Sequence, residues 1–436
     1  MTKRSDELFR QLAEIPVVDV HSHISRDRMH SPGLDHSLFY HMLTYVMRSA
    51  GLDIDKLWAG PKDPNTAPRD DFVRAWPMIS QTGFGRILKA ILRDLYDFDG
   101  PFTEKGIEEL DKIYSERNAR PDWPKEVLRK ANVVRICSSE HNVEPLKDGQ
   151  WGGNIRFTTE KTPSGGTHEY KTWTDRFTGL GERLGRDVKS RADLEEAIRL
   201  YYDAMSWQDK EPVLVAWVSS AADFTPIDDD ELARLLTGLT EGREPGQVEA
   251  RLLEGAFLRA ICKVIREYVR VFQLCYGVQF LSGSPKNPIQ RAAPSFAQTF
   301  GYLLGEFPDL HFNLLNGYEN DDPIWCGLCQ GYGNISLTSH WWTAFFPTAM
   351  HGGWSRRFDM VPLNRLCAFL SDGWSVDYVY GRLWMTRRVL ANVLAERIER
   401  GLMNGEEALA AARRVLFETP GEIFLPDERI DPSAAF

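Results

Sequence analysis

The sequence predicts an α/β fold, a (β/α)8 TIM-like barrel with a helical insertion after its first strand. Short apolar runs rich in β-branched residues alternate with longer segments of helical periodicity along the 436 residues. The runs are apolar almost throughout, as are strands that are buried on both faces of a parallel sheet. No glycine-rich phosphate loop follows the first run, and this lowers the expectation of an open, nucleotide-binding sheet.

Eight runs are expected to be strands. In chain order they cover residues 16–23 (PVVDVHSH), 132–139 (NVVRICSS), 170–175 (YKTWTD), 212–220 (PVLVAWVSS), 277–283 (GVQFLSG), 311–317 (HFNLLNG), 334–340 (NISLTSH) and 365–372 (RLCAFLSD). Helical patterns lie between them. The longest, EARLLEGAFLRAICKVIREYVRVFQLCYG, is expected to be one helix that ends at Gly277 as its C-cap glycine.

One barrel domain is expected over residues 1–436, because a single α/β barrel with insertions reaches this length. Residues 35–125 form a long, mostly helical insertion between the first two strands, which we expect to cap the carboxyl-terminal mouth of the barrel. Residues 145–168 are rich in Gly and Thr and suit a loop or hairpin.

Composition excludes several classes of protein. The net charge is −10 and no basic stripe occurs, so nucleic acid is not an expected partner. No apolar run approaches the length of a membrane span, and the N-terminus lacks the apolar core of a signal peptide, which favours a cytoplasmic protein. Six scattered cysteines are expected to be reduced, and the Cys326-x-x-Cys329 pair to be structural.

The segment VVDVHSH places two histidines at the end of the first strand. Strand alternation sends His21 and His23 to the same side, so both imidazoles can bind one divalent metal ion. The active sites of such barrels are built at the carboxyl ends of the strands, which favours this interpretation over two solvated strand-end histidines.

A carboxylate is expected to complete the metal site. Asp372 ends the eighth expected strand, which lies beside the first in a closed barrel. Alone, this aspartate could equally be the N-cap of the following helix. Its combination with the two histidines favours a metal ligand.

Asp19-x-His21-x-His23 together with Asp372 resembles the metal site of the amidohydrolase superfamily of metal-dependent hydrolase-type barrels. More narrowly, the chain resembles the uronate (glucuronate and galacturonate) isomerases, as a divergent member. The similar segments are FYHMLTYVMRSAG, LRKANVVRICSSE, ENDDPIWCGLCQGYGNISLTSHWW, FLSDGWSVDYVYGRLWMTRRVLANVLAE and LFETPGEIF, and they extend over most of the chain.

The resemblance implies a metal-dependent aldose-ketose isomerase that acts on a uronate or related sugar acid through an enediol. It implies one divalent metal ion, zinc first and manganese or iron as alternatives. The same residues suit two other functions, namely a mononuclear hydrolase of lactones, esters or amides, and a catalytically inactive sugar-binding barrel. The expected partner is a small-molecule substrate. No association with a membrane is expected, and a homo-oligomer is possible.

The sequence also departs from the pattern of these families. The fourth expected strand has no lysine to bridge two metals, and Leu281 and Ser282 occupy the expected fifth-strand histidine position. Family members tend to carry an arginine before the aspartate of the third strand and another after that of the eighth. At these positions the expected register has Trp173 and Trp374.

The remaining candidates surround the expected barrel mouth. Tyr40 and His41 are candidate catalytic residues beside Asp372, although either could be a core residue of an amphipathic helix. The candidate substrate-binding residues are Arg48, Glu319, His340, Trp341, Trp342 and Trp374. Arg48 could instead pair with an acidic side chain, His340 could be a ligand, and tryptophans more often pack than bind sugars.

Overall fold

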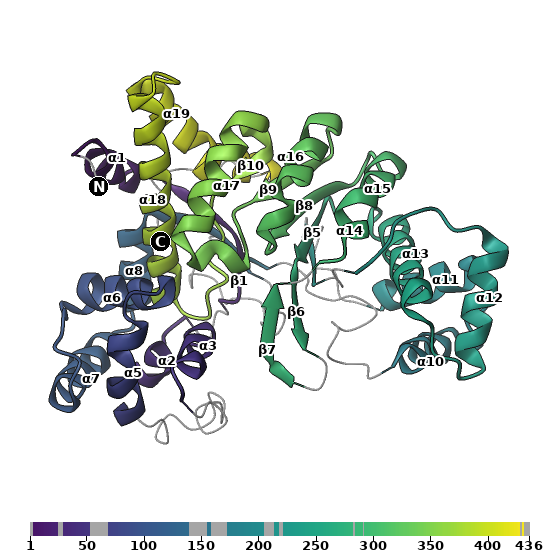
Figure 1. Cartoon of the computed structure of the whole chain (residues 1–436), viewed down its shortest axis with the longest axis horizontal. Coiled ribbons are helices and arrows are strands. Elements are labelled where there is room, and N and C mark those ends of the chain that lie inside the picture. The colour runs from purple at the N-terminus through teal and green to yellow at the C-terminus, as the bar shows by residue number, and fades with distance from the viewer. Residues whose placement is uncertain are drawn as a thin grey trace.

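The computed structural model describes residues 3–24, 29–52, 69–138, 155–157, 172–204, 213–217, 221–281, 284–290, 292–427 and 430. In this part of the chain, parallel strands form the centre of the molecule and helices surround them (Figure 1). None of the described helices is long and apolar enough to cross a membrane.

The strands form two parallel sheets. The three-stranded sheet has the order β1-β2-β3, with β1 (Val17–Ser22), β2 (Val133–Ser138) and β3 (Ile155–Phe157). The five-stranded sheet has the order β10-β9-β8-β5-β4, with β4 (Val213–Trp217), β5 (Val271–Tyr276), β8 (His311–Asn316), β9 (Ile335–Thr338) and β10 (Leu366–Cys367).

The segment after β10 joins the two sheets. The backbone N–H of Val20 donates to the carbonyl of Phe369 at 3.4 Å, and that of Ser371 donates to the carbonyl of His21 at 3.1 Å. The eight strands therefore follow one another in chain order, with the last beside the first, and this is the arrangement of a (β/α)8 barrel. The predicted fold class is confirmed.

Helices connect the strands. Between β1 and β2 lie α2 (Leu34–Leu38), α3 (His41–Ser49), α5 (Arg69–Ile79), α6 (Gly83–Tyr96), α7 (Glu104–Asn118) and α8 (Trp123–Ala131). Between β3 and β5 lie α10 (Trp173–Leu184), α11 (Arg191–Asp203), α12 (Asp229–Thr240) and α13 (Gln247–Ile265). Later helices are α14 (Pro294–Thr299), α15 (Gly301–Glu306), α16 (Asp322–Gly331), α17 (Pro347–Met360), α18 (Val376–Glu399), α19 (Gly405–Arg413) and α20 (Thr419–Phe424), and α1 (Lys3–Ala13) precedes β1.

Two of the eight expected barrel strands are wrong. Residues 172–175 form the N-cap and first turn of α10, where the side chain of Thr172 accepts from the backbone N–H of Asp175, so no strand forms there. The third barrel strand is β3, inside the segment that was expected to be a loop or hairpin. Residues 145–154, 158–168 and 170–171 lie outside the described residues.

The fifth strand also differs from the expectation. The predicted helix ends at Ile265, and the apolar residues that follow form β5, which lies between β8 and β4 in the five-stranded sheet. The run expected to be the fifth strand forms β6 (Val278–Leu281), which pairs with β7 (Ser284–Gln290) in an antiparallel hairpin. Gly277 has φ +100° and connects two strands, so it is not a helix C-cap.

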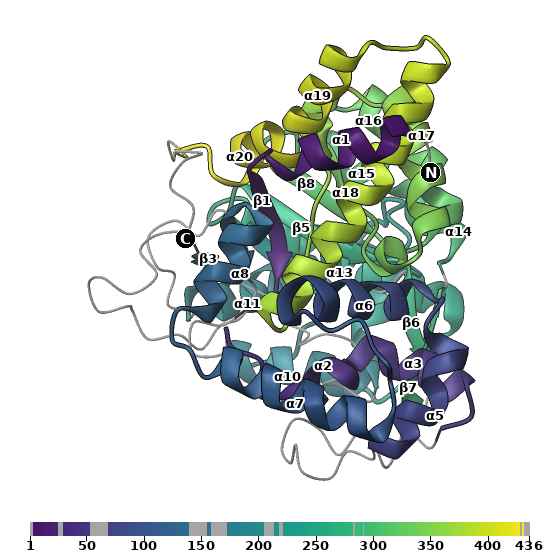
Figure 2. The ribbon, with the colours of Figure 1, turned by 90° about the vertical axis from the view of Figure 1, so that its left-hand side faces the viewer.

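The helices of the β1–β2 connection are held against the last barrel helix. Figure 2 shows α2, α3, α5 and α7 beyond the carboxyl-terminal end of β1, with α19 and α20 toward its other end. Buried Asp377, in the first turn of α18, accepts hydrogen bonds from Tyr114 at 2.6 Å, Tyr96 at 3.0 Å and Ser37 at 3.5 Å. Burial raises the pKa of Asp377 above its usual value.

A close approach of α18 to α6 adds to this attachment. A Cβ atom on Gly381 would come within 2.6 Å of the Ile91 side chain, so only glycine fits without a shift. The apolar face of α6 is buried in the main core, which lies between the strands and the surrounding helices. These contacts place the connection between β1 and β2 at the end of the barrel where His21 and His23 lie.

Candidate metal centre

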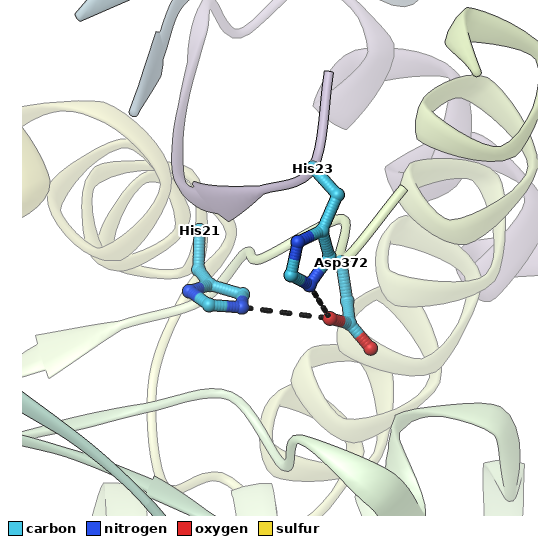
Figure 3. A group of neighbouring side chains, drawn as sticks. All are labelled: His21, His23 and Asp372. Carbon is cyan, nitrogen blue, oxygen red and sulfur yellow. Dashed lines mark hydrogen bonds and ion pairs between the residues drawn. The ribbon is translucent and has the colours of Figure 1, made fainter. Parts of the chain in front are cut away.

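Two histidines and one aspartate converge at the carboxyl-terminal end of β1. Figure 3 shows His21 and His23 directed toward Asp372. The Oδ1 atom of Asp372 lies 3.1 Å from Nε2 of His23 and 3.5 Å from Nε2 of His21. His21 and Asp372 are each only 3% exposed, whereas His23 is half-buried. The structure therefore brings together the three predicted metal ligands.

The backbone fixes the position of Asp372. Its N–H donates to the carbonyl of His21 at 2.9 Å, and the N–H of His23 donates to the carbonyl of Gly373 at 3.0 Å. Asp372 has φ +48°, in the left-handed region that aspartate adopts more readily than most residues. The N-cap residue of α18 is Ser375, so the alternative in which Asp372 caps that helix is wrong.

Gln273 on β5 determines which nitrogen of His21 faces the site. Its Nε2 donates to the carbonyl of Val20 at 3.1 Å, and a carbonyl can only accept, so the amide oxygen must face His21. This Oε1 lies 2.9 Å from Nδ1 of His21. Nδ1 of His21 is thus the donor, and in the neutral ring Nε2 keeps its lone pair toward Asp372.

The orientation of Gln273 is itself fixed by the barrel interior. Its Nε2 also donates to Oδ1 of Asn313 on β8 at 3.1 Å, and Thr338 on β9 donates to the same oxygen at 2.8 Å. The Nδ2 of Asn313 donates to Ser336 at 2.9 Å, and Ser336 contacts Nε2 of His311 at 2.8 Å. A connected hydrogen-bond network therefore supports His21 from across the barrel.

The three side chains fit a divalent metal ion. Two tetrahedral ligands with bonds of about 2.0–2.1 Å lie about 3.3 Å apart. The Nε2 atoms of His23 and His21 lie 3.1 and 3.5 Å from Oδ1 of Asp372. Two imidazoles and one carboxylate are a common ligand set for zinc and other first-row ions. In the described part of the chain, no other group of three His, Cys, Asp or Glu side chains comes together in this way.

The strands that could supply further ligands support one metal ion. β4 contains no lysine and β5 contains no histidine. The fifth-strand position assigned to Leu281 and Ser282 is wrong, because Leu281 belongs to the β6–β7 hairpin and Ser282 lies outside the described residues. On β5, Gln273 faces the interior and buried Cys275 follows two positions later on the same face.

Arg382 on α18 lies on the other side of the Asp372 carboxylate. Its Nη1 is 3.4 Å from Oδ2 of Asp372, and the arginine is 1% exposed. Burial alone would raise the pKa of Asp372, but interactions with the two histidines and the charge of Arg382 hold it well below its usual value. The carboxylate is therefore ionised, as a metal ligand must be.

Two aromatic candidates each contact one of the proposed ligands directly. The hydroxyl of buried Tyr40 donates to the carbonyl of Asp372 at 3.0 Å, and its ring stacks on Tyr378 at 3.5 Å. Trp374 stacks on His23 with ring centroids 4.8 Å apart and remains 42% exposed. Trp374 thus forms an exposed aromatic surface beside the half-buried histidine.

The other candidates lie farther out. Trp341 is buried, its carbonyl accepts from Arg382, and its ring lies 6.4 Å from that of half-buried Trp342. Trp342 contacts Tyr45 of α3, and half-buried Arg48 belongs to the same helix. His41 is the first residue of α3, and its side chain lies outside the described residues.

His340 and Glu319 belong to a neighbouring region. His340 is 0% exposed, and its Nε2 lies 3.8 Å from Oδ1 of Asp322, which Arg357 binds at 2.7 Å. Half-buried Glu319 begins a 3-10 turn just before α16, and its carboxylate lies beside Gly352 of α17. Neither residue contacts the three ligands in the described structure.

Two residues of the site were missed in the sequence. Gln273 could have been found as a lone polar residue in the apolar run VFQLCY, had this run been recognised as a strand. Arg382 could have been noticed within the mostly apolar sequence VDYVYGRLWM. Trp173 and Asp175, expected on the third strand, lie instead in the first turn of α10.

No family model matches the sequence. The uronate isomerase of Nostoc punctiforme is 19% identical over 455 aligned positions, which cover 94% of this chain and 93% of that protein. The crystal structure of glucuronate isomerase from Caulobacter crescentus has a TM-score of 0.80 at 19% identity and covers 98% of this chain and 95% of that one. The chain is a divergent homologue of the uronate isomerases.

A second uronate isomerase structure supports the same conclusion. The enzyme from Thermotoga maritima has a TM-score of 0.79 at 18% identity, with 98% of both chains covered. The fold of these two solved structures therefore extends over nearly the whole chain. The resemblance that was predicted from short motifs is confirmed, and the identity to these proteins is low.

Proposed function

We propose that the protein is a metal-dependent isomerase that interconverts the aldose and ketose forms of a uronate or related sugar acid. The observation that carries the proposal is the convergence of His21, His23 and Asp372 within a barrel that matches uronate isomerases over its length. Zinc is the proposed metal, with manganese and iron as alternatives. A cytoplasmic location and a role in carbohydrate metabolism belong to the same proposal.

The ligands have separate roles in this proposal. His21 and His23 hold the metal through Nε2, and Oδ1 of Asp372 completes the protein ligands. The bound metal supplies Lewis-acid polarisation of the substrate carbonyl and adjacent hydroxyl, which acidifies the proton on C2. The Asp372 carboxylate would accept the C2 proton and return it to C1, while the hydroxyl proton moves from O2 to O1, so that the reaction proceeds through an enediol.

Surrounding residues bind and orient the substrate. Trp374 offers an exposed indole face on which a sugar ring can stack beside His23. Tyr40 fixes the backbone of Asp372. We place six residues in the outer part of the substrate site: Arg48 and His41, which belong to the proposed cap of residues 35–125, and Trp341, Trp342, His340 and Glu319.

An isotope experiment tests the isomerase directly. The purified chain is incubated in heavy water with glucuronate and galacturonate, and sugars are examined for solvent deuterium at C1 and C2. Deuterium uptake with ketose formation is expected, because the abstracted proton exchanges with solvent in part of the turnovers. His21→Ala should lose both metal and turnover, and a fully active, metal-free H21A variant would contradict the proposal.

Trp374 favours a second candidate function. The sugar-acid isomerases tend to have an arginine at this position, and an exposed indole lacks the charge that binds a carboxylate. The same ligands could then hydrolyse a lactone, ester or amide with metal-activated water. Turnover of a lactone and ester panel without deuterium uptake from uronates would favour the hydrolase. Elemental analysis that finds no metal would favour an inactive sugar-binding barrel.

A further inference from the structure

Arg382 is a buried cation beside the proposed metal centre. Its guanidinium approaches Oδ2 of Asp372 at 3.4 Å through Nη1, and its Nη2 donates to the carbonyl of Trp341 at 3.2 Å. Its charged carbon lies 4.1 Å from the ring centre of Phe345. The guanidinium is therefore confined between a carbonyl, an aromatic ring and the carboxylate.

The two oxygens of Asp372 have different surroundings. Oδ1 faces the two imidazoles, whereas Oδ2 has no hydrogen-bond partner in the described part of the chain. The Nε and Nη1 atoms of Arg382 likewise have no hydrogen-bond partner there. The ion pair with Arg382 is thus the polar contact of Oδ2 with the described residues, and it makes the two carboxylate oxygens inequivalent.

We propose that Arg382 is a positioning residue that holds Oδ2 of Asp372, so that Oδ1 alone binds the metal. The inference rests on the metal site of the proposed function. A carboxylate can bind a metal through one or both oxygens. Oδ2 paired with a guanidinium cannot turn toward the metal, and the coordination position it would occupy stays open for substrate oxygen atoms.

The neighbouring structure favours this role over direct substrate binding. Arg382 is 1% exposed, and it follows Gly381, which packs closely against α6. α18 is fixed there by Asp377, five residues earlier, through its hydrogen bonds with Tyr96 and Tyr114. The guanidinium is therefore carried by a rigid element, as the supporting residues of a precise site are.

Cobalt(II) is the probe that tests the inference, because its visible absorption weakens as the coordination number rises above four. The variants are Arg382→Met, which removes the charge, and Arg382→Lys, which keeps the charge but loses the planar fork. Arg387→Met is the matched control. Arg387 is buried on the same helix, where its guanidinium donates to the carbonyls of Ala131 at 2.8 Å and Ile15 at 2.9 Å rather than to any of the three proposed ligands.

We expect R382M to bind Co²⁺ and Zn²⁺ about 10–100-fold more weakly, the loss typical of residues that orient a metal ligand. Its Co²⁺ absorption should weaken as Asp372 binds through both oxygens. R382K should lie between R382M and the unmodified chain, whereas R387M should keep the affinity and spectrum even if its stability falls.

An R382M variant with unchanged affinity and spectrum would overturn the inference. If R382M does not fold, unchanged values in R382K would overturn it equally. Failure of the proposed function is distinguishable: an unmodified chain that binds Co²⁺ but does not convert uronates contradicts the isomerase and leaves this inference standing. An unmodified chain that binds no metal contradicts both.

Discussion

The amide oxygen of Gln273 on β5 lies 2.9 Å from Nδ1 of His21 on β1, on the side of the imidazole opposite the proposed metal position. This contact joins one strand from each of the two parallel sheets. The Nε2 of Gln273 donates to the backbone of Val20, so the amide cannot flip without losing that bond. The Nε2 atom of His21 is therefore the ring nitrogen that faces the proposed metal position.

Substitution of Gln273 should weaken metal binding. Gln273→Leu removes the acceptor of the Nδ1 proton, so the ring can turn or change tautomer, and we expect a 10–100-fold loss of zinc affinity in a chelator competition. Gln330→Leu is the control, since Gln330 is exposed on α16 and donates to one backbone carbonyl. Equal zinc affinity in Q273L and Q330L would show that Gln273 has no part in the site.

Trp374 should contribute to substrate binding more than to the chemical step. Trp374→Ala removes the exposed indole beside His23 but none of the three ligands. Loss of one stacking contact of about 1 kcal/mol corresponds to a rise of about five-fold in KM with little change in kcat. Tyr302→Ala, which removes an exposed aromatic ring from α15, is the control. An unchanged KM in W374A would exclude stacking on this ring.

Asp377 should be important for stability rather than for catalysis. Asp377→Ala leaves the hydroxyls of Tyr96 and Tyr114 without their buried acceptor, and we expect a loss of about 3 kcal/mol in the free energy of unfolding. Asp359→Ala, which breaks an exposed ion pair with Arg397, should cost less than about 1 kcal/mol. Denaturant titration of both variants measures the difference, and similar losses would contradict the importance of the tyrosine contacts.

His340 should make stability depend on pH. Burial and the charge of Arg357 lower the pKa of His340 to about 3 from 6.5, so the ring is neutral in the folded chain. Between these values the unfolded chain binds a proton that the folded chain does not, so this contribution to stability falls as pH decreases below about 6.5. The loss is at most about 1.4 kcal/mol per pH unit.

Unfolding measured at pH 7, 6 and 5 tests this dependence. His340→Gln should flatten the difference between pH 7 and pH 5, because glutamine does not titrate. His351→Gln is the control, since His351 on α17 is half-buried and pairs with Glu396 near the surface. The same steep dependence in H340Q as in the unmodified chain would assign it to other groups.

The grouping of the three proposed metal ligands could be predicted from sequence because each position follows from local rules. His21 and His23 share a side through strand alternation, and Asp372 ends the last strand, which barrel closure places beside the first. The structure confirms that the three side chains lie together, and both histidines approach the same oxygen, Oδ1 of Asp372. Only the backbone conformation of Asp372, with φ +48°, had no signal in the sequence.

The fifth strand could not be recognised for a physical reason. The apolar residues of α13 are followed by those of β5 with only a short turn between them, so helical periodicity appears to continue to Gly277. The strand was therefore placed one segment late, and Gln273 was hidden inside an expected helix. The contacts of Arg382 depend on how α18 packs against α6, and no pattern within one helix reveals such packing.

The proposed metal ligands come from opposite ends of the chain, since His21 lies on the first strand and Asp372 follows the last. The site exists only where the segment after β10 is hydrogen-bonded to β1. During synthesis, the histidines leave the ribosome long before the aspartate is made. Tight metal binding therefore cannot begin until the barrel has closed. Because the ion would bind only the closed barrel, its binding would stabilise the complete fold over partly folded chains.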